Sequence, residues 1–359
     1  MSDAHWIQIT NTTGVFGLFL SLSSNSILLL MMSLKASPVQ GVYKKILIFF
    51  CCFTIFYSLV EAFLRPLIHI ADNTLFVMQR KWFAMDSTAS RLTTTMYCGC
   101  YAMSFVLFAL QFLYRYVSTC KPQYVDYFQG SRFLLWILGA LGISLSWEAA
   151  AFFLFPQSSR TQESFLYIIK NSYNLDPKDM DYIPYRYFEI DHNNGEFQII
   201  TLNIIGIIQH IIIMTVSFGT LFFCACTTYS TIIKHKGMSA KTRELQMQLF
   251  RALVVQATIP MIFMYCPLLF LYLCPLLNLQ LGALANYQTI MGQLYPGVDP
   301  FAVLFLVATY RRTLFNWICL KSTSSRNSVV NENSQFDVTP RGAQRPKSST
   351  VSAHVVNNN

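Results

Sequence analysis

Long uncharged runs alternate with short charged segments along the chain up to about residue 320. Seven of these runs are apolar and long enough to supply the roughly 20 helical residues that cross a bilayer. A lipid-embedded segment must satisfy its own backbone, so each run is expected to form one helix. The pattern therefore predicts an all-α membrane protein, a bundle of seven transmembrane helices. The expected spans are 12–34, 46–71, 96–117, 133–155, 201–233, 248–273 and 284–308.

The composition agrees with a membrane protein. Of the 359 residues, 53% are hydrophobic and 12% are charged, whereas soluble domains carry about 25% charged residues. The net charge of +9 does not form a basic stripe with interleaved aromatics, so nucleic acid is not an expected partner. The ten cysteines fall mostly in apolar runs without histidines at ligand spacing, and we interpret them as packing residues. No metal or cofactor motif is found.

The basic residues predict the orientation of the bundle. If the N-terminus is outside, eighteen of the 26 Lys and Arg residues fall on the inner side, seven fall outside and Arg65 lies within a span. Short loops follow the positive-inside rule, so an outer N-terminus and a cytoplasmic C-terminus are favoured. The long outer loop, residues 156–200, holds seven acids against four bases and does not oppose this orientation.

The remaining segments follow from this topology. Residues 1–11 form the outer N-terminus; they lack a basic cluster, so the first apolar run is expected to be retained rather than cleaved. Asn11 begins an N-glycosylation acceptor, Asn-Thr-Thr, although it lies close to the first span. Residues 12–309 form the transmembrane domain. An interfacial helix is expected over residues 310–319.

Residues 320–359 are rich in Ser and Asn and have no apolar periodicity, which predicts a disordered cytoplasmic tail. Basic residues directly precede three hydroxyl residues at 345–350. Phosphorylation there would reverse the local charge, so a receptor kinase and arrestin are candidate partners of the tail. Cys319, at the membrane edge, is either palmitoylated or an unmodified thiol.

Arg115 ends the third apolar run. It lies nineteen residues beyond Met96, about 28 Å along a helix, and so reaches the inner edge of the bilayer. Two interpretations are open. The side chain extends to the interface, as arginines at helix ends do, or it contacts a neighbouring helix and an intracellular partner.

Four ordered motifs support the second interpretation. They are Phe112-Leu113-Tyr114-Arg115-Tyr116 with Thr119-Cys120-Lys121-Pro122, Gly41-Val42-Tyr43-Lys44, the stretch 248–260, and Leu294-Tyr295-Pro296-Gly297-Val298-Asp299-Pro300. With them the chain resembles the Str-type chemoreceptors of nematodes, and within that family an olfactory receptor for diacetyl. The resemblance implies a chemosensory G-protein-coupled receptor in the plasma membrane, in the cilium of a sensory neuron. The implied partners are a small volatile or soluble organic ligand and the α-subunit of a heterotrimeric G protein.

The chain departs from related sequences at two places. Gln111 stands where a histidine is expected one turn above Arg115, so the ligand preference does not carry over. Many G-protein-coupled receptors bridge the third span to the long outer loop by a disulfide. Cys98 or Cys100 could supply one half, but residues 156–200 contain no cysteine. The outer loop must therefore be held by packing and hydrogen bonds, or remain mobile.

The expected G-protein contacts lie at the inner end of the bundle. The start of the sixth span is an amphipathic basic helix, which is either a solvated collar or a docking edge. The candidates are Arg115, Tyr116, Lys241, Arg243, Arg251, Arg311 and Arg312. Prolines bend the sixth and seventh spans and mark expected conformational switches. The switch candidates are Pro260, Pro267, Pro296, Asp299 and Pro300.

A ligand pocket is expected between the outer halves of spans three, five, six and seven. Residues within reach by depth are Tyr101, Ser104, Phe105, Gln111, His210, Tyr265, Asn286, Tyr287 and Gln288. The many aromatic residues and few buried charges favour a small, weakly polar organic ligand. Glu61 and Arg65 stand one turn apart on the second span and are expected to pair with each other.

A seven-helix ligand-gated channel or transporter is the alternative. It requires polar residues along a path, or broken half-helices. The few intramembrane charges do not align into such a path, and the basic residues oppose an inverted orientation. A membrane enzyme is disfavoured, because no histidine stands in a nucleophile or metal arrangement.

Overall fold

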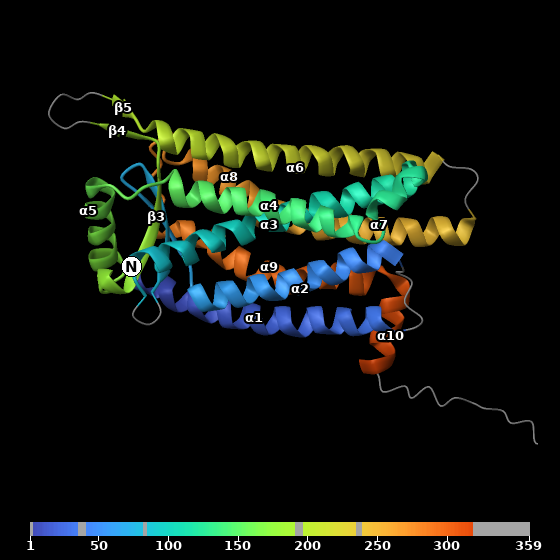
Figure 1. The fold of residues 1–359 in the computed structure, drawn as a ribbon. Coiled ribbons are helices and arrows are strands. Elements are labelled where there is room, and N and C mark those ends of the chain that lie inside the picture. The colour runs from blue at the N-terminus through green and yellow to red at the C-terminus, as the bar shows by residue number, and fades with distance from the viewer. Residues whose placement is uncertain (1–2, 35–40, 82–84, 191–196, 235–238, 319–359) are drawn as a thin grey trace, which may run out of the picture.

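The computed structural model describes residues 3–34, 41–81, 85–190, 197–234 and 239–318. Long helices run side by side and form a bundle, with a small β-sheet at one end (Figure 1). The helices that build the bundle are α1 (Ala4–Ser33), α2 (Gly41–Leu64), α3 (Ser87–Cys120), α4 (Arg132–Phe153), α6 (Thr201–Lys234), α7 (Ala240–Pro260), α8 (Cys266–Leu273) and α9 (Asn286–Leu306). Cys319, the tail 320–359 and its hydroxyl cluster lie outside the described residues.

Six helices of the described chain are long and apolar enough to cross a membrane. The sixth of them is α7, a π-helical turn η4 (Met261–Tyr265) and α8 in succession. A seventh span results if α9 and α10 (Ala308–Ile318), which meet at an angle of 101°, are taken as one bent unit. The predicted seven-helix membrane bundle is therefore the observed fold class, and α3 is its most buried helix.

The first helix begins eight residues earlier than predicted, so residues 4–11, which were expected to precede the first span, are helical. Its threonines bond back to the helix carbonyls: the Thr10 hydroxyl donates to Trp6 O at 2.9 Å, and that of Thr13 to Ile9 O at 2.8 Å. Polar side chains that bond within the helix do not end it. Asn11 lies in this helical segment and is half-buried, in a crevice that Arg65 also lines.

The second helix ends at Leu64, and the prediction that the span continues to Ala71 is wrong. Arg65 adopts a left-handed conformation with φ of +48°, and Pro66 follows it, which disfavours helix at the preceding residue. The chain then forms the strands β1 (Leu67–Ala71) and β2 (Thr74–Arg80). Asp72 and Asn73 join them, both at positive φ, as a two-residue hairpin turn requires.

The long loop supplies the third strand, β3 (Met180–Arg186). It pairs antiparallel with β2 over seven residues, from Thr74 opposite Arg186 to Arg80 opposite Met180. The strand order is β1-β2-β3, so Pro184 lies on an edge strand, where its missing N–H is tolerated. We call this sheet, with α5 (Ser159–Tyr167) and η2 (Ile168–Ser172) beside it, the cap.

A second apolar core joins the cap to the start of α1, apart from the main core of the bundle. Its buried residues are Trp6, Leu67, Phe76, Met78, Phe165, Ile168, Ile169, Tyr173, Met180, Tyr182 and Ala283. The long loop is thus held by strand pairing and packing. The nine cysteines of the described residues, Cys98 and Cys100 included, are free thiols.

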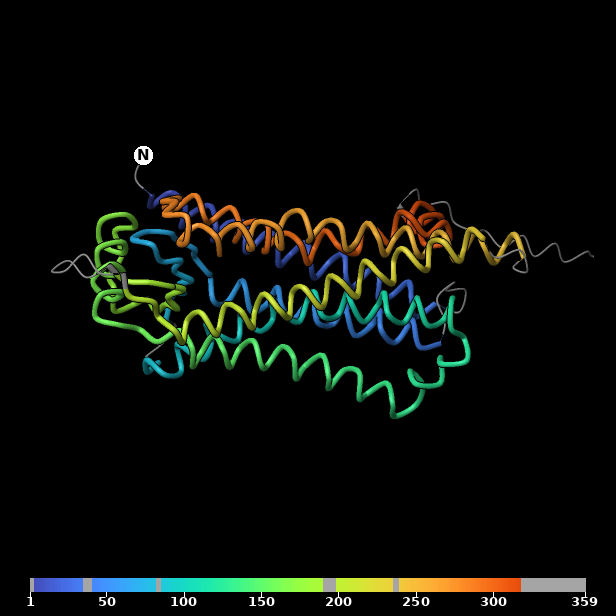
Figure 2. The backbone as a smooth tube through the Cα atoms, turned by 90° about the horizontal axis from the view of Figure 1, so that it is seen from above, coloured from blue at the N-terminus to red at the C-terminus, as the bar shows by residue number. Residues whose placement is uncertain are grey.

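Shorter elements complete the chain. They are η1 (Pro122–Phe128), η3 (Pro177–Asp179), β4 (Phe188–Ile190) paired with β5 (Phe197–Ile199), and η5 (Ala283–Ala285). Figure 2 shows that α4 leans away from the other helices toward the end opposite the cap. We call that opposite end, where α3 ends and α7 begins, the basic end.

Candidate functional site

A small cavity lies directly under the sheet of the cap. Its volume is about 40 Å³; because one buried water needs about 10–15 Å³, it has room for roughly three waters. Its walls come from the sheet and from α3, α4, α8 and α9. The lining residues are Ile68, Leu75, Val77, Tyr97, Cys98, Tyr101, Trp147, Tyr185, Leu268, Leu271, Tyr272 and Gln288.

The walls are aromatic and aliphatic, with few polar groups. Gln288 Nε2 donates to the Tyr101 hydroxyl at 2.8 Å, while Gln288 Oε1 is buried and has no hydrogen-bond partner within the described residues. The Tyr185 hydroxyl points to Cys98 Sγ at 3.8 Å. This arrangement suits a compact apolar molecule that has one polar group.

Four of the predicted residues form part of the wall and the floor of this cavity. Tyr101 lines it. One turn further down α3, the Ser104 hydroxyl is 2.8 Å from the Tyr265 hydroxyl. Phe105 packs with its edge toward Trp147, with ring centroids 5.6 Å apart, and toward Tyr265 at 5.4 Å. Ser104, Phe105 and Tyr265 thus form a layer beneath the cavity rather than its lining.

His210 and Gln111 lie further from the cavity. The His210 ring stacks on Trp147, with centroids 3.8 Å apart and planes at 4°, so it supports a wall residue from behind. Its Nδ1 is 3.4 Å from the hydroxyl of Tyr272, another wall residue. Gln111 is fully buried deeper in the bundle, and both of its amide atoms lack a hydrogen-bond partner within the described residues.

Asn286 and Tyr287 are neighbours with different surroundings. Asn286 fastens the cap to α9: its Oδ1 accepts from Ile68 N at 2.9 Å and its Nδ2 donates to the Tyr173 hydroxyl at 3.0 Å. Tyr287 is 58% exposed and packs edge-on against Trp6, so it faces away from the cavity.

The same polar network reaches His69 of the sheet. Its Nδ1 is 3.1 Å from the Tyr173 hydroxyl, and the residue is 4% exposed. Burial lowers the pKa of His69 to about 4, because a low-dielectric surrounding disfavours the charged imidazolium. The cap is therefore built around a neutral histidine.

At the basic end, Arg115 is buried rather than extended toward solvent, with 4% of its surface exposed. Its Nη1 donates to Gln246 Oε1 at 2.9 Å, and its Nη2 donates to Gln246 O at 3.4 Å. The guanidinium also lies over the ring of Tyr43, 4.6 Å from the centroid. Arg115 thus ties α3 to α7 and to α2, through neutral partners.

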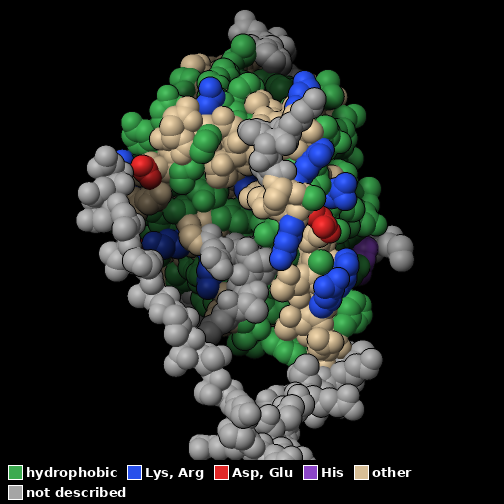
Figure 3. All heavy atoms as spheres, turned by 90° about the vertical axis from the view of Figure 1, so that its right-hand side faces the viewer, with side chains coloured by type: hydrophobic (Ala, Val, Ile, Leu, Met, Phe, Trp, Pro, Cys, Tyr) green, Lys and Arg blue, Asp and Glu red, His purple; other side chains and the backbone are tan. Residues whose placement is uncertain are grey.

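The other predicted coupling residues surround this contact. Lysines and arginines gather on this end of the molecule (Figure 3). Tyr116 packs against Phe223 of α6. Two arginines bond to carbonyls near helix ends: Arg243 Nη2 donates to Ile233 O at 3.0 Å, and Arg311 Nη1 donates to Phe305 O at 3.0 Å. The exposed members are Lys241, Arg243, Arg251, Arg311 and Arg312.

The predicted switch prolines interrupt the sixth span. Pro260 ends α7, the π-helical turn η4 follows, and Pro267 stands near the start of α8. Proline lacks the N–H that would bond four residues back, and its ring clashes with that carbonyl. A π-turn is one of the ways in which a helix accommodates such a break.

In α9, Pro300 removes the donor that Pro296 O would otherwise receive. Asn25 of α1 replaces it: its Nδ2 donates to Pro296 O at 2.9 Å. Asp299 Oδ2 accepts from Gln256 Nε2 of α7 at 2.7 Å. The proline-weakened stretch of α9 is thus held by α1 on one side and by α7 on the other.

The comparisons with known proteins agree with this architecture. The model of the serpentine-type seven-transmembrane G-protein-coupled chemoreceptor family Str matches residues 10–315. The chain belongs to the Str family. The predicted family resemblance is thereby confirmed, and the closer resemblance to an olfactory receptor for diacetyl stays a prediction. The Str family is a receptor family.

Individual relatives extend over most of this Str receptor. Serpentine receptor class r-10 of Caenorhabditis elegans is 35% identical over 325 residues, which cover 90% of this chain and 95% of that protein. The protein of the same name from Caenorhabditis briggsae is 33% identical over 326 residues, with 90% and 95% coverage. The crystal structure of squid rhodopsin superposes with a TM-score of 0.58 at 14% identity, covering 89% and 83% of the two chains. At that identity the likeness concerns the fold alone.

Several residues that line the cavity were not predicted from the sequence. Tyr185 and Leu75 come from strands that were not predicted, and Trp147 and Tyr272 were not selected among the many aromatics. One signal was present: Asp72-Asn73 between two apolar runs is a hairpin sequence. No local signal indicates which face of α8 turns toward α3.

Proposed function

We propose that this Str receptor is an olfactory G-protein-coupled receptor. A small, weakly polar organic compound binds in the cavity under the cap, and a heterotrimeric G protein is activated at the basic end. The observation that carries the proposal is that the interrupted sixth span contributes residues both to the cavity and to the Arg115 contact. Its α8 lines the cavity through Leu268 and Tyr272, and its α7 holds Arg115 through Gln246.

The proposed mechanism follows from the size of the cavity. Ligand pockets commonly measure about 300–1,000 Å³, whereas this one measures about 40 Å³, so a ligand must displace its walls. The wall that can move is α8, since the π-turn beneath it is flanked by Pro260 and Pro267. A shift of α8 and α7 would take Gln246 away from Arg115 and open the basic end, as in a two-state equilibrium that a ligand biases.

The orientation belongs to the same proposal. The cap faces outward and the basic end faces the cytoplasm, because Lys and Arg favour the inner side in short loops. Arg115 and Tyr116 then contact the Gα subunit. The exposed bases Lys241, Arg243, Arg251, Arg311 and Arg312 add electrostatic attraction. The plasma membrane of a sensory cilium is the proposed site of action, with a kinase and arrestin acting on the tail.

The test is expression of the full chain in cultured cells with a promiscuous Gα, challenged with pools of small volatiles. Surface staining selects cells with equal display, and Arg115→Ala is run in parallel. A second-messenger response that requires both Gα and Arg115 supports the proposal. A ligand-evoked current that survives the loss of both would contradict it and support the channel alternative.

A further inference from the structure

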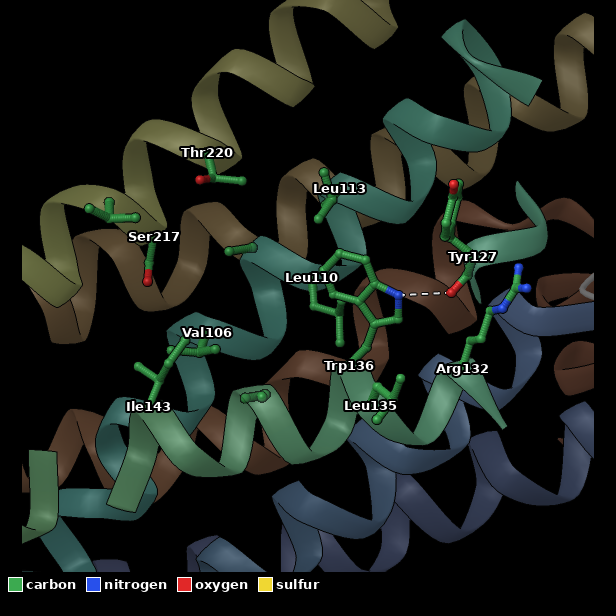
Figure 4. Close-up of a pocket in the computed structure, with 14 residues that line it drawn as sticks. Val106, Leu110, Leu113, Tyr127, Arg132, Leu135, Trp136, Ile143, Ser217 and Thr220 are labelled. Carbon is green, nitrogen blue, oxygen red and sulfur yellow. Dashed lines mark hydrogen bonds between the residues drawn. The ribbon is translucent and has the colours of Figure 1, made fainter. Parts of the chain in front are cut away.

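A second and larger cavity lies elsewhere, on the membrane-facing side of the bundle. It is a groove of about 740 Å³ between α3, α4 and α6. In Figure 4, Leu110 and Leu113 of α3, Trp136 and Ile143 of α4, and Thr220 of α6 border a common space. None of its lining residues lines the cavity under the cap.

The groove arises where α4 leans away from α6 (Figure 2). Small residues leave it unfilled: a Cβ added at Gly139 would meet no atom within 4 Å, and Ala109 and Ala140 also line it. Bulky exposed side chains such as Leu135, 67% exposed, stand at its rim. An apolar groove of this size, open to the bilayer, is accessible to the hydrocarbon chains of lipids.

The length of the groove matches the hydrocarbon thickness of one leaflet of the bilayer. Arg132 is the first residue of α4 and lines one end of the groove, while Ile143 lines the other. Eleven helical residues span about 16 Å, which is close to half of the roughly 30 Å hydrocarbon core. The groove therefore extends from the interface at the basic end to near the middle of the membrane, the depth that a lipid acyl chain occupies.

The interfacial end of the groove carries a positive charge. The Arg132 guanidinium lies over the ring of Tyr127, 5.5 Å from its centroid, and no acidic side chain within the described residues pairs with it. Trp136 Nε1 donates to the backbone carbonyl of Tyr127 at 3.0 Å, which holds these two residues together at a depth where Trp and Tyr favour the membrane interface. The apolar walls offer no other charge.

We propose that this groove is a binding site for an anionic glycerophospholipid of the leaflet at the basic end. One acyl chain lies between α4 and α6, and the phosphate meets Arg132. A sterol would fill the apolar part but bring no negative charge to Arg132. The lipid would bridge two helices that diverge, beside α3, and so stabilise the bundle on that side.

Native mass spectrometry of the purified full-length receptor tests the site. The receptor is titrated with phosphatidylglycerol or with phosphatidylcholine of identical chains. One arginine at a membrane surface contributes about 1 kcal/mol toward an anionic lipid, so we expect about fivefold tighter binding of phosphatidylglycerol. Arg132→Gln should abolish this preference. Lys121→Gln, which removes an exposed charge near the same end but outside the groove, should retain it.

The apolar half of the site is tested by a second variant with its own matched control. Gly139→Leu fills the groove and should weaken binding of both phospholipids. Gly142→Leu adds the same side chain to the same helix, where an added Cβ likewise meets no atom within 4 Å, but Gly142 does not line the groove. The proposal would be overturned if Arg132→Gln kept the wild-type preference for phosphatidylglycerol. It would also be overturned if Gly139→Leu and Gly142→Leu weakened phospholipid binding equally. Displacement of both phospholipids by cholesterol at equal concentration would also overturn it.

Discussion

At the scale of single residues, the guanidinium of Arg115 has an unusual set of partners. It is buried, yet its contacts are an amide oxygen, a backbone carbonyl and the face of a tyrosine, and its Nε lacks a partner within the described residues. A buried charge without a counter-charge is costly. The contact with Gln246 is therefore expected to hold the closed state until another partner reaches Arg115.

Gln246→Leu should raise activity without ligand. A hydrogen bond to a charged group contributes about 1.5–3 kcal/mol, so its loss should shift the closed-to-open equilibrium by about tenfold or more. The measurement is ligand-independent second-messenger output at matched surface display. Glu244→Gln, on an exposed part of the same helix, serves as the control. Unchanged basal output in Gln246→Leu would mean that this contact does not hold the receptor closed.

Two neighbouring residues of α9 allow the position of the ligand to be tested, because one lines the cavity and the other does not. Gln288→Ala removes a polar group that lines the cavity and should weaken the potency of an activating volatile by about tenfold, the effect of one hydrogen bond of about 1.4 kcal/mol. Tyr287→Ala alters an exposed side chain outside the cavity and should leave potency unchanged. Dose–response curves of both variants check this, and the opposite order of effects would place the ligand elsewhere.

His69 gives the cap a dependence on pH. Its pKa is lowered to about 4 in the folded state from about 6.5 when unfolded, so as the pH falls the unfolded chain takes up the proton first. Stability is full above about pH 6.5 and should decline toward pH 4, by at most about 3 kcal/mol. The unfolding temperature between pH 7.5 and pH 4.5 measures this. His69→Gln should flatten the decline, whereas a change at the exposed His5 should not; an unaltered profile in His69→Gln would exclude the role.

At the scale of elements, the broken sixth span is the part suited to move. Pro267→Ala restores a donor and removes a ring clash, which favours continuous helix by up to about 3 kcal/mol. We expect a higher unfolding temperature and a lower maximal response to ligand. Pro275→Ala, just beyond α8, is the control. A full response from the straightened helix would show that the π-turn is not the hinge.

The spans could be predicted because their signal is local. A run of about twenty apolar residues requires a helix in a bilayer whatever its neighbours. The short strands gave only the turn signal of Asp72-Asn73. Leu67–Ala71 is as apolar as the helix before it, and it forms a strand by pairing with β2, which in turn pairs with β3, more than a hundred residues further along the chain. The prediction that Glu61 and Arg65 pair with each other is also wrong. Arg65 adopts a left-handed conformation and leaves the helix, and both carboxylate oxygens of Glu61 lack a hydrogen-bond partner within the described residues.

The candidate site was predictable only in outline. Depth along the helices indicated Tyr101, which lines the cavity, but it also indicated Tyr287, which faces away from it. With nineteen tyrosines and thirty phenylalanines in the chain, composition alone does not identify the inward faces. Likewise the sequence marked Arg115 but not its partner, since Gln246 is 131 positions away.

At the scale of the whole molecule, the cavity under the cap and the Arg115 contact lie at opposite ends of one bundle. In the proposed mechanism these ends are coupled through α8, η4 and α7. Such coupling implies that a ligand at one end changes the spacing of helices at the other.

The most direct test is a distance between α3 and α7 at the basic end. Spin labels at Lys121 and Lys241, carried on unnatural amino acids so that the native cysteines remain, report it by double electron–electron resonance. If the two ends are coupled in this way, an activating volatile shifts the distribution to longer distances, and Gln246→Leu shifts it without ligand. An unchanged distribution in the presence of a volatile that activates the G protein would show that α3 and α7 do not separate on activation.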